Sequence, residues 1–315
     1  MQGIGVWVGR VVLGSVVTVV TLELGLFALS GYEGRRARPV ERPDADMVVL
    51  CVGDSHTYGA PLPEAESYPS QLQARLKATY PDKTFSVINL GVPGANTRMI
   101  RNRLPEWLDR YQPDVLLLWA GINNSWNVAE TDRESGLQGL LFRSRVWRLI
   151  SRLRFDRANA RGDGRADLLE AKDGGSRWQV AGQVVETRRA ELRTEDWQPG
   201  LEADLIAIAE LARERNVRIS WMTYPVMADH LRAVNETIQQ VGKSLQVFTV
   251  DGSFNVMVAR KQGHVDSELM VDAAGPHPTG LLYSYFVDSL MAHMAIYLGT
   301  WNGGPAPGIL DRSKG

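Results

Sequence analysis

Two short segments, far apart in the sequence, contain residues that could carry out nucleophilic chemistry together. In the first, the apolar run 47–52 stops at a glycine and is followed by Asp54-Ser55-His56. A serine hydroxyl is a weak nucleophile unless a base takes its proton. The best base in the sequence is His277, whose backbone is restricted by a proline on each side within a Gly/Pro loop. The pattern therefore favours Ser55 as a nucleophile with His277 as its base.

Attack by a serine on an acyl group also needs hydrogen-bond donors for the oxyanion, and three loops can supply them. The backbone N–H of Ser55 is the first donor. A glycine N–H within 91–94 is the second, because a residue without a side chain allows close approach. The side-chain amide of Asn123 is the third. Serine, glycine, asparagine and histidine on four loops would make a complete hydrolase site.

The order of apolar segments predicts a scaffold that brings these loops to one edge. Short continuous apolar runs alternate with segments of helical period, which is typical of an α/β fold with a parallel sheet covered on both faces. Ligands bind at the carboxyl ends of the strands in such sheets, where the loops 53–59, 91–97 and 121–127 would meet. The expected strands are 47–52, 85–90, 115–120, 217–224 and 247–250, and the expected helices are 68–79, 97–109 (interrupted or restarted at Pro105), 201–215, 234–245 and 281–298.

Four sequence blocks occur in the order seen in the SGNH/GDSL hydrolase superfamily, which the chain resembles over about 48–298. GDSHTYG is similar to the family's GDSxTxG, NLGVPGANT to its second block, GINN to GxND and AGPHP to DxxHP. The resemblance implies a flavodoxin-like three-layer α/β/α sandwich with about five parallel strands, and hydrolysis of esters or thioesters through an acyl-enzyme. It makes Ser55 the nucleophile and His277 the base. It also assigns the oxyanion hole to Ser55, Gly94 and Asn123, with Gly91 as the alternative to Gly94.

The sequence departs from the family pattern at two positions. Asn124 stands where the family has aspartate; this changes the surrounding hydrogen bonds and leaves the oxyanion donor in place, so we expect activity to survive. Ala274 stands where the family has the orienting acid, three residues before His277. Asp272 is the candidate acid if the loop bulges. The alternative is a Ser–His dyad, in which a backbone carbonyl orients the imidazole.

Composition argues against several other functions. The formal net charge of -1 gives no global signal for nucleic acid. The single cysteine, Cys51, rules out an intramolecular disulfide and is expected to be a small buried hydrophobe. The histidines are scattered without metal-ligand spacing, so we expect neither a metal nor a cofactor. Of the residues beside Ser55, Asp54 is expected to bond backbone amides, and His56 to face away from the serine hydroxyl.

The first 30 residues differ from the rest of the chain. The segment 6–31 is apolar except for Arg10 and Glu23, and is long enough to cross a hydrocarbon core of about 30 Å as a helix. An uncleaved anchor, a cleaved signal peptide and a buried helix all fit it. We favour an anchor with the catalytic domain exported, periplasmic or at the cell surface, although the arginines after the span would hold that side in the cytoplasm. The expected organisation is 1–30 anchor or signal, 31–46 linker, 47–300 hydrolase-like domain and 301–315 tail.

An Arg-rich insert at 128–200 breaks the alternation and is too long for a simple connection. Its segment 140–155 has the pattern of a basic amphipathic helix. This helix either packs on the domain as an ordinary helix or serves as a lid that lies on anionic lipid. The remainder, 158–200, is polar and is expected either to be mobile or to cover a substrate cleft.

Three functions follow from this reading. The favoured one is a membrane-tethered serine esterase that hydrolyses O-acyl esters, either of an O-acetylated cell-surface glycan or of a lipid. The same site could instead serve an O-acyltransferase that moves acetyl groups onto a glycan. The third is a catalytically silent glycan-binding protein, for which the missing aspartate at position 274 is the main support.

Overall fold

The structure is a computed structural model that describes residues 40–131, 165–172, 175–225, 229–271 and 277–300, together with Thr21. The chain divides into two compact units, 1–39 with 132–161 and 40–131 with 162–315. Apart from Thr21, the described residues all belong to the second unit. Several predictions therefore lie outside the described residues: the membrane helix or signal, most of the linker, the basic helix, Asp272 and the C-terminal tail.

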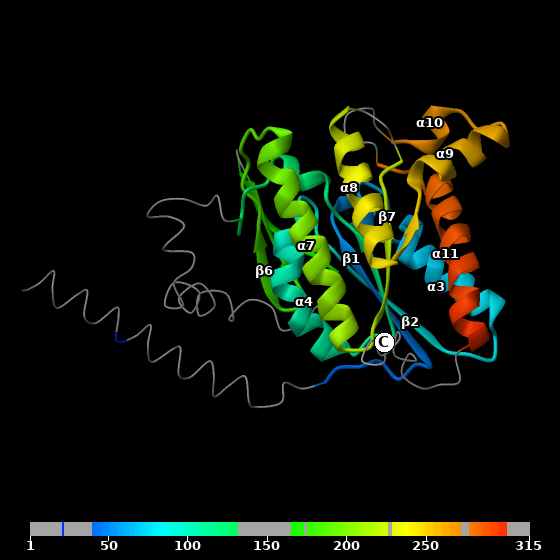
Figure 1. Ribbon diagram of the computed structural model, residues 1–315. Helices are drawn as coiled ribbons and strands as arrows, with labels where there is room; N and C mark the ends of the chain where they lie inside the picture. Colours follow the sequence, from blue (N-terminus) through cyan, green and yellow to red (C-terminus); the bar gives the residue numbers. More distant parts are fainter. Residues whose placement is uncertain are drawn as a thin grey trace, which may run out of the picture. The chain divides into compact units, whose positions relative to one another are not determined.

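A five-stranded parallel sheet forms the centre of this second unit (Figure 1). Every residue of β1 and β3 is buried, as expected for apolar strands with helices on both faces. The predicted α/β fold with about five parallel strands is confirmed. The strand order is β2-β1-β3-β7-β8, with β1 at Met47–Gly53, β2 at Phe85–Gly91, β3 at Val115–Trp119, β7 at Arg218–Met222 and β8 at Phe248–Val250.

The helices form two layers, as right-handed crossover connections require. α3 (Tyr68–Thr79), α9 (Gly252–Lys261) and α11 (Gly280–Thr300) cover one face, where α11 packs against both α3 and α9. α4 (Thr97–Tyr111), α7 (Thr194–Glu214) and α8 (Asp229–Leu245) cover the other, with α7 in contact with its two neighbours (Figure 1). The chain steps from β1 to β2 and then returns across β1 to β3. The order thus reverses between β1 and β3, which is where ligands bind in sheets of this kind.

Three helix predictions need correction, and one of them is α8, which begins at Asp229 rather than at residue 234. α4 runs without interruption through Pro105, so the predicted break at that residue is wrong. A proline inside a helix costs one backbone hydrogen bond, but the buried face of α4 continues past it through Trp107 and Leu108, and this packing holds the helix together. α7 begins at Thr194 rather than at residue 201. The short helices α9 and α10 (Asp266–Leu269) were not predicted.

Part of the insert is a second, three-stranded antiparallel sheet, for which no strand was predicted. It is joined to the loop that follows β3 by a bridge between Asn127 and Arg189, and by the N–H of Val128, which donates to the carbonyl of Arg188 at 2.9 Å. At least this part of the segment 158–200 is folded. The strands are β4 (Asp167–Lys172), β5 (Gly175–Val180) and β6 (Gln183–Glu186).

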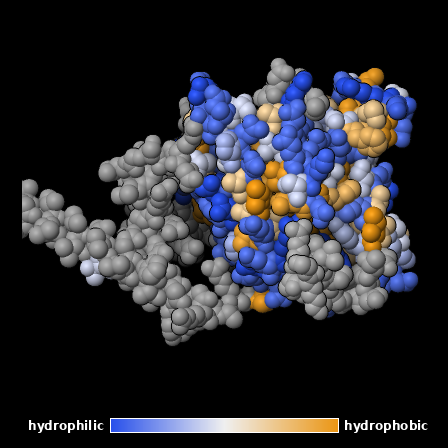
Figure 2. Space-filling view, viewed as in Figure 1, coloured by the Kyte–Doolittle hydropathy of each residue, from blue (hydrophilic) through white to orange (hydrophobic). Residues whose placement is uncertain are grey.

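In the view of Figure 2, the upper ends of α7 and α8 are hydrophilic, while apolar side chains gather along the middle of these helices and over α9 and α10. Phe254 and Val265 are more than half exposed there. Among the described helices, only α11, over Gly280–Leu298, is long and apolar enough to cross a membrane. One face of this helix is buried in the core, with Leu282, Phe286 and Leu290 fully inaccessible.

Cys51 lies in the middle of β1 and is completely buried, as predicted. Burial raises the pKa of its thiol to about 12, and a hydrogen bond with Tyr68 offsets only part of that effect. The thiol is therefore a protonated, apolar part of the core.

Candidate active site

Ser55 is placed by a tight turn at the carboxyl end of β1. A Cβ added at Gly53 would lie 2.1 Å from both Thr57 Oγ1 and the carbonyl oxygen of Trp119, so only glycine fits where the strand ends. The next residue, Asp54, is the N-cap of the short helix α2 (Ser55–Tyr58), and its Oδ1 accepts the N–H of His56 at 2.9 Å. The prediction that Asp54 bonds a backbone amide is confirmed. Ser55 is then the first helical residue, half-exposed at the edge of the sheet.

His277 lies beside Ser55, although 222 positions separate them in the sequence. Its Nε2 is 2.9 Å from Ser55 Oγ, a hydrogen-bond distance. The histidine is held where its carbonyl accepts the N–H of Val271 at 2.9 Å, and where Met270 bridges to Pro278. These contacts fix both ends of the segment that contains Asp272, which itself lies outside the described residues.

Asn123 lies in the 3-10 helix η2 (Ile122–Ser125) that follows β3, and its side chain is held in one orientation. Its Nδ2 donates to the carbonyl of Ala95 at 3.0 Å, and its Oδ1 accepts the indole N–H of Trp126 at 2.9 Å. An amide nitrogen carries two hydrogens, so this arrangement leaves one of them for another acceptor. The same contacts tie the loop 121–127 to the loop 91–97.

The two glycines proposed for the oxyanion hole differ in their backbone donors. The N–H of Gly91 donates to Asn89 Oδ1 at 3.0 Å and is therefore committed. Gly94 has a φ of 81°, in the left-handed region that favours glycine, and its N–H donates to no residue that the structure describes. The N–H of Ser55 is likewise unpaired within the described part of the chain. Of the two glycines, Gly94 is therefore the one whose N–H has no acceptor among the described residues.

Comparison with known proteins shows the family of this chain. Residues 51–283 match the model of the GDSL-like lipase/acylhydrolase family. The chain belongs to this family. It is accordingly a serine hydrolase of ester bonds.

Similar solved structures include the psychrotrophic esterase EstA from Pseudoalteromonas sp., with 14% identity, a TM-score of 0.48, and coverage of 80% of this chain and 98% of that one. They also include the acetyl xylan esterase Axe2 from Geobacillus stearothermophilus, with 15% identity, a TM-score of 0.46, and coverage of 84% and 97%. No curated protein matches the chain.

The structure explains why this GDSL-family chain has Asn124 where aspartate was expected. Asn124 Nδ2 donates to Thr97 Oγ1 at 2.8 Å, and its Oδ1 accepts the N–H of Thr97 at 3.0 Å. The hydroxyl of Thr97 in turn donates to the buried Asp204 at 3.1 Å. A carboxylate at position 124 could not donate to the hydroxyl. The asparagine therefore bonds both the N–H and the hydroxyl of Thr97, the first residue of α4, whose N-cap is Asn96.

Sequence reasoning missed Tyr224 and Asp204, which come from distant segments. The Tyr224 hydroxyl donates to Asp54 Oδ2 at 2.5 Å and accepts the N–H of Ile122 at 3.0 Å, so it links the loop of Ser55 to the loop of Asn123. Burial, and next the charge of Asp54, raise the pKa of Tyr224 well above its usual value, so the hydroxyl keeps its proton. No sequence signal marked either residue, because Tyr224 only ended a predicted strand and Asp204 lay on a predicted helix.

Aromatic and charged side chains from the insert lie next to α2. The ring of Trp178 in β5 meets the ring of Tyr58 edge-on, with centroids 5.7 Å apart. The guanidinium of Arg165 lies 4.4 Å from the centre of the Tyr58 ring and pairs with Glu64 at 2.8 Å. Because Tyr58 is one turn after Ser55, the antiparallel sheet lies near the helix that carries the serine.

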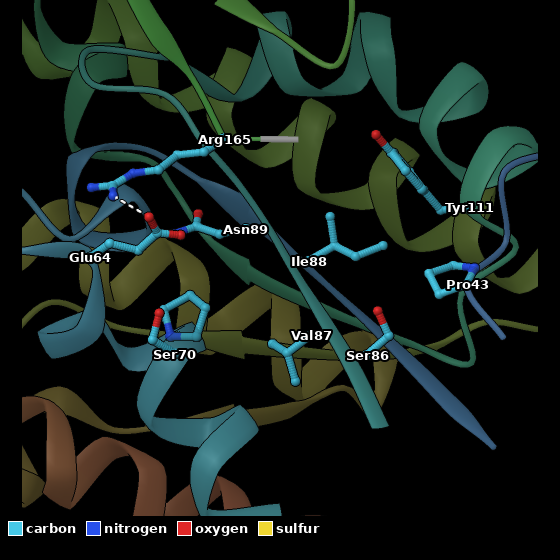
Figure 3. A pocket seen from close by; sticks show the side chains of 10 residues that line it. Pro43, Glu64, Ser70, Ser86, Val87, Ile88, Asn89, Tyr111 and Arg165 are labelled. Carbon is cyan, nitrogen blue, oxygen red and sulfur yellow. Dashed lines mark hydrogen bonds and ion pairs between the residues drawn. The ribbon is translucent and has the colours of Figure 1, made fainter. Parts of the chain in front are cut away.

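A cavity of about 320 Å³ lies along β2 (Figure 3). Arg165 and Glu64 lie at one end of it, and Tyr111 and Pro43 at the other. None of Ser55, Asn123 and His277 lines this cavity, so it is separate from the serine–histidine pair. Within the described residues there is no cluster of His, Cys, Asp or Glu that could hold a metal.

Proposed function

We propose that this chain hydrolyses O-acyl esters through an acyl-enzyme on Ser55, with His277 as the general base. The observation that carries the proposal is the distance of 2.9 Å between His277 Nε2 and Ser55 Oγ. A nucleophile and a base at this separation are the recurring signature of a serine hydrolase. Ester hydrolysis itself follows from the family; the assignment of the two residues is our proposal.

In the first half of the reaction, His277 Nε2 takes the hydroxyl proton as Ser55 Oγ bonds to the acyl carbon. The carbonyl oxygen becomes an oxyanion, which accepts hydrogen bonds from the N–H groups of Ser55 and Gly94 and from Asn123 Nδ2. The tetrahedral intermediate collapses, and the C–O bond to the alcohol breaks. His277 returns its proton to the leaving alkoxide.

In the second half, His277 takes a proton from water, and the hydroxide attacks the acyl-enzyme. The same three donors stabilise the second oxyanion, and Ser55 leaves with the proton from His277. We propose Asp272 as the acid that orients His277, with a dyad oriented by a backbone carbonyl as the alternative. Asp272→Asn separates them: a triad predicts a large loss of kcat, and a dyad predicts near-wild-type activity.

We further propose that the enzyme is tethered to a membrane by the segment 6–31 and works outside the cytoplasm. The support is the apolar character and length of that segment. The proposed substrates are O-acetyl groups on a cell-surface glycan or the ester of a lipid. Removal of residues 1–30 distinguishes them, since hydrolysis of a lipid in vesicles would drop much more than hydrolysis of a soluble ester.

The test of the nucleophile is covalent labelling with a fluorophosphonate probe. We expect the probe to label wild-type enzyme at Ser55, and labelling and p-nitrophenyl acetate turnover to vanish in Ser55→Ala. The matched control is Ser284→Ala, which removes a half-buried serine hydroxyl on α11 that bonds only the carbonyl of Leu281 within the described residues. Full turnover by Ser55→Ala would refute the proposal. Added glycan acceptors that divert the acyl group from water would instead indicate a transferase.

A further inference from the structure

A second imidazole lies directly against the base. The ring of His56 is stacked on the ring of His277, with centroids 4.9 Å apart and an angle of 25° between the planes. The side chain of His56 is 1% exposed, so this contact is part of the interior. The family takes its name from the residues Gly-Asp-Ser-Leu, and His56 occupies the place of that leucine. The proposed mechanism does not use this imidazole.

His56 is held rigidly by an acidic partner. Its Nδ1 lies 3.2 Å from Asp54 Oδ1, and because a carboxylate only accepts, Nδ1 carries the hydrogen. Asp54 is completely buried and also accepts the hydroxyl of Tyr224. The carbonyl of His56 accepts the hydroxyl of Tyr283 at 2.8 Å. Hydrogen bonds to both the backbone and the side chain of His56 thus fix the position of its ring.

Aromatic rings pack against His56 on several sides, and the ring of His277 is one of them. The ring centroid of Trp119 lies 5.2 Å from that of His56, with the planes tilted, and the centroid of Tyr224 lies 4.8 Å away in an edge-to-face contact. Among the described residues, the titratable groups in contact with His56 include Asp54, Tyr224 and His277 at its ring and Tyr283 at its carbonyl. Both tyrosines have pKa values raised by burial, so neither supplies a second negative charge. Among these residues the carboxylate is that of Asp54, which bonds Nδ1 of His56.

We propose that His56 is a positioning residue for His277, an inference that rests on the proposed function. In the transition state His277 becomes a cation, since it has taken the proton of Ser55. The π face of a neutral imidazole attracts such a cation, and the carboxylate of Asp54 polarises His56 through their hydrogen bond. The same stack restricts rotation of the His277 ring away from Ser55. Because the cation exists only after proton transfer, the benefit belongs to kcat rather than to substrate binding.

Three substitutions separate the stack from the hydrogen bond. His56→Leu removes both and restores the family's namesake residue. His56→Asn keeps a donor for Asp54 and removes the ring, whereas His56→Phe keeps a ring and removes the donor. The control is His264→Asn. The imidazole of His264 pairs with Glu268 at 3.4 Å, and the residue is far from Ser55 in the sequence and outside the catalytic loops. Thermal unfolding of each variant confirms that it is folded.

We expect His56→Leu and His56→Asn to lower kcat about tenfold to a hundredfold with KM within about twofold of wild type, as loss of a transition-state interaction requires. His56→Phe should recover most of the kcat, and His264→Asn should match wild type. In His56→Leu the midpoint of the acidic limb of kcat/KM should move to lower pH, since the cation of His277 is less favoured. A role in folding alone would leave this midpoint in place.

Wild-type kcat and an unchanged pH profile in both His56→Leu and His56→Asn would overturn the inference. A loss confined to KM would overturn it as well. The proposed function is judged separately, by whether a fluorophosphonate labels Ser55 in the wild-type enzyme. If Ser55 is labelled while the two variants behave as wild type, only the role of His56 is wrong. If Ser55 is not labelled, the proposed function fails whatever the variants do.

Discussion

The two sheets of the enzyme are built on opposite principles. The parallel sheet is built around β1 and β3, two apolar strands in which every residue is buried. The antiparallel sheet β4–β6 has half-exposed strands joined by ion pairs such as Arg177 with Glu186 at 2.7 Å, and Leu168 is 53% exposed. Exposed ion pairs contribute little stability, on the order of 0–1 kcal/mol each. The first sheet therefore holds the fold together, and the second is an addition whose value lies in its position.

The buried Asn127 is one of the links between the added sheet and the catalytic edge. Asn127 Nδ2 donates to the carbonyl of Gly94 at 2.8 Å, and its Oδ1 accepts the N–H of Arg188 at 2.9 Å. Thr187 lies against Gly94 as well, since a Cβ built there would be 2.9 Å from its methyl carbon. The loop that supplies the proposed oxyanion donor is thus packed between the two sheets. The comparison predicts that changes in the parallel sheet affect catalysis or stability, whereas changes in the added sheet affect substrate choice.

The largest effect is expected for His277→Ala, at the carboxyl edge of the parallel sheet. Without the base, kcat/KM should fall by about 10⁴ or more, which is typical for removal of a catalytic histidine. The melting temperature should change little, because the half-exposed ring contributes little to the core. Steady-state kinetics with p-nitrophenyl acetate measure the loss. Residual activity above about a hundredth of wild type would show that another base acts at Ser55.

A matched pair of leucine substitutions compares the stability of the two sheets. Leu50→Ala, at a fully buried position in β1, should lower the free energy of unfolding by about 2–5 kcal/mol. The same substitution at the exposed Leu168 of β4 should change it by less than about 0.5 kcal/mol. Urea denaturation of both variants gives the comparison. Equal losses would mean that the added sheet is as much a part of the core as β1.

A smaller effect is expected for Trp178→Ala, which removes the ring that meets Tyr58. If the added sheet contacts the substrate, KM for a bulky glycan or lipid ester should rise about threefold to tenfold, equivalent to about 1 kcal/mol of lost contact. KM for p-nitrophenyl acetate, a small ester, should stay the same. Leu168→Ala is the control from the same sheet. If Trp178→Ala changed KM by the same factor for bulky and small esters, the added sheet would have no role in substrate recognition.

The smallest effect is the pH dependence of the free energy of unfolding. It concerns the parallel sheet and its helices, because the described part of β4–β6 contains no histidine. Burial of His293 against Phe248, where the rings are 3.6 Å apart, lowers its pKa from 6.5 to about 4. Below pH 6.5 the unfolded chain takes up a proton that the folded protein accepts only near pH 4. The free energy of unfolding should therefore fall as the pH drops through this window. In His293→Gln, denaturation at pH 7 and 5 should show a shallower fall; an unchanged slope would contradict the assignment.

The fold was predictable where burial made the sequence pattern simple. β1 and β3 are continuous apolar runs because both faces are covered, and α3 has the predicted bounds because Leu72 and Leu76 mark its buried stripe. The strands of the added sheet were missed because their sequence pattern is short and irregular. Polar and apolar residues alternate only over 177–180, and β4 and β6 each contain a pair of adjacent apolar residues.

The site was predictable to the extent that topology alone determines it. Ser55 and Asn123 follow neighbouring strands at the point where strand order reverses, and His277 lies in a rigid loop just before the last helix. The structure brings the imidazole to the hydroxyl. The network behind it was beyond sequence reasoning, since the bond from Tyr224 to Asp54 and the stack of the two imidazoles depend on tertiary packing over long separations. Asp272 stays a prediction.

The burial of Cys51 has a practical consequence. The chain contains no other thiol, and this one is sealed inside β1 and stays protonated at neutral pH. Reaction with maleimides requires an accessible thiolate, so a cysteine introduced at an exposed position such as Val265 would be modified selectively. A fluorophore or spin label could then be attached at a chosen site without first removing a native residue.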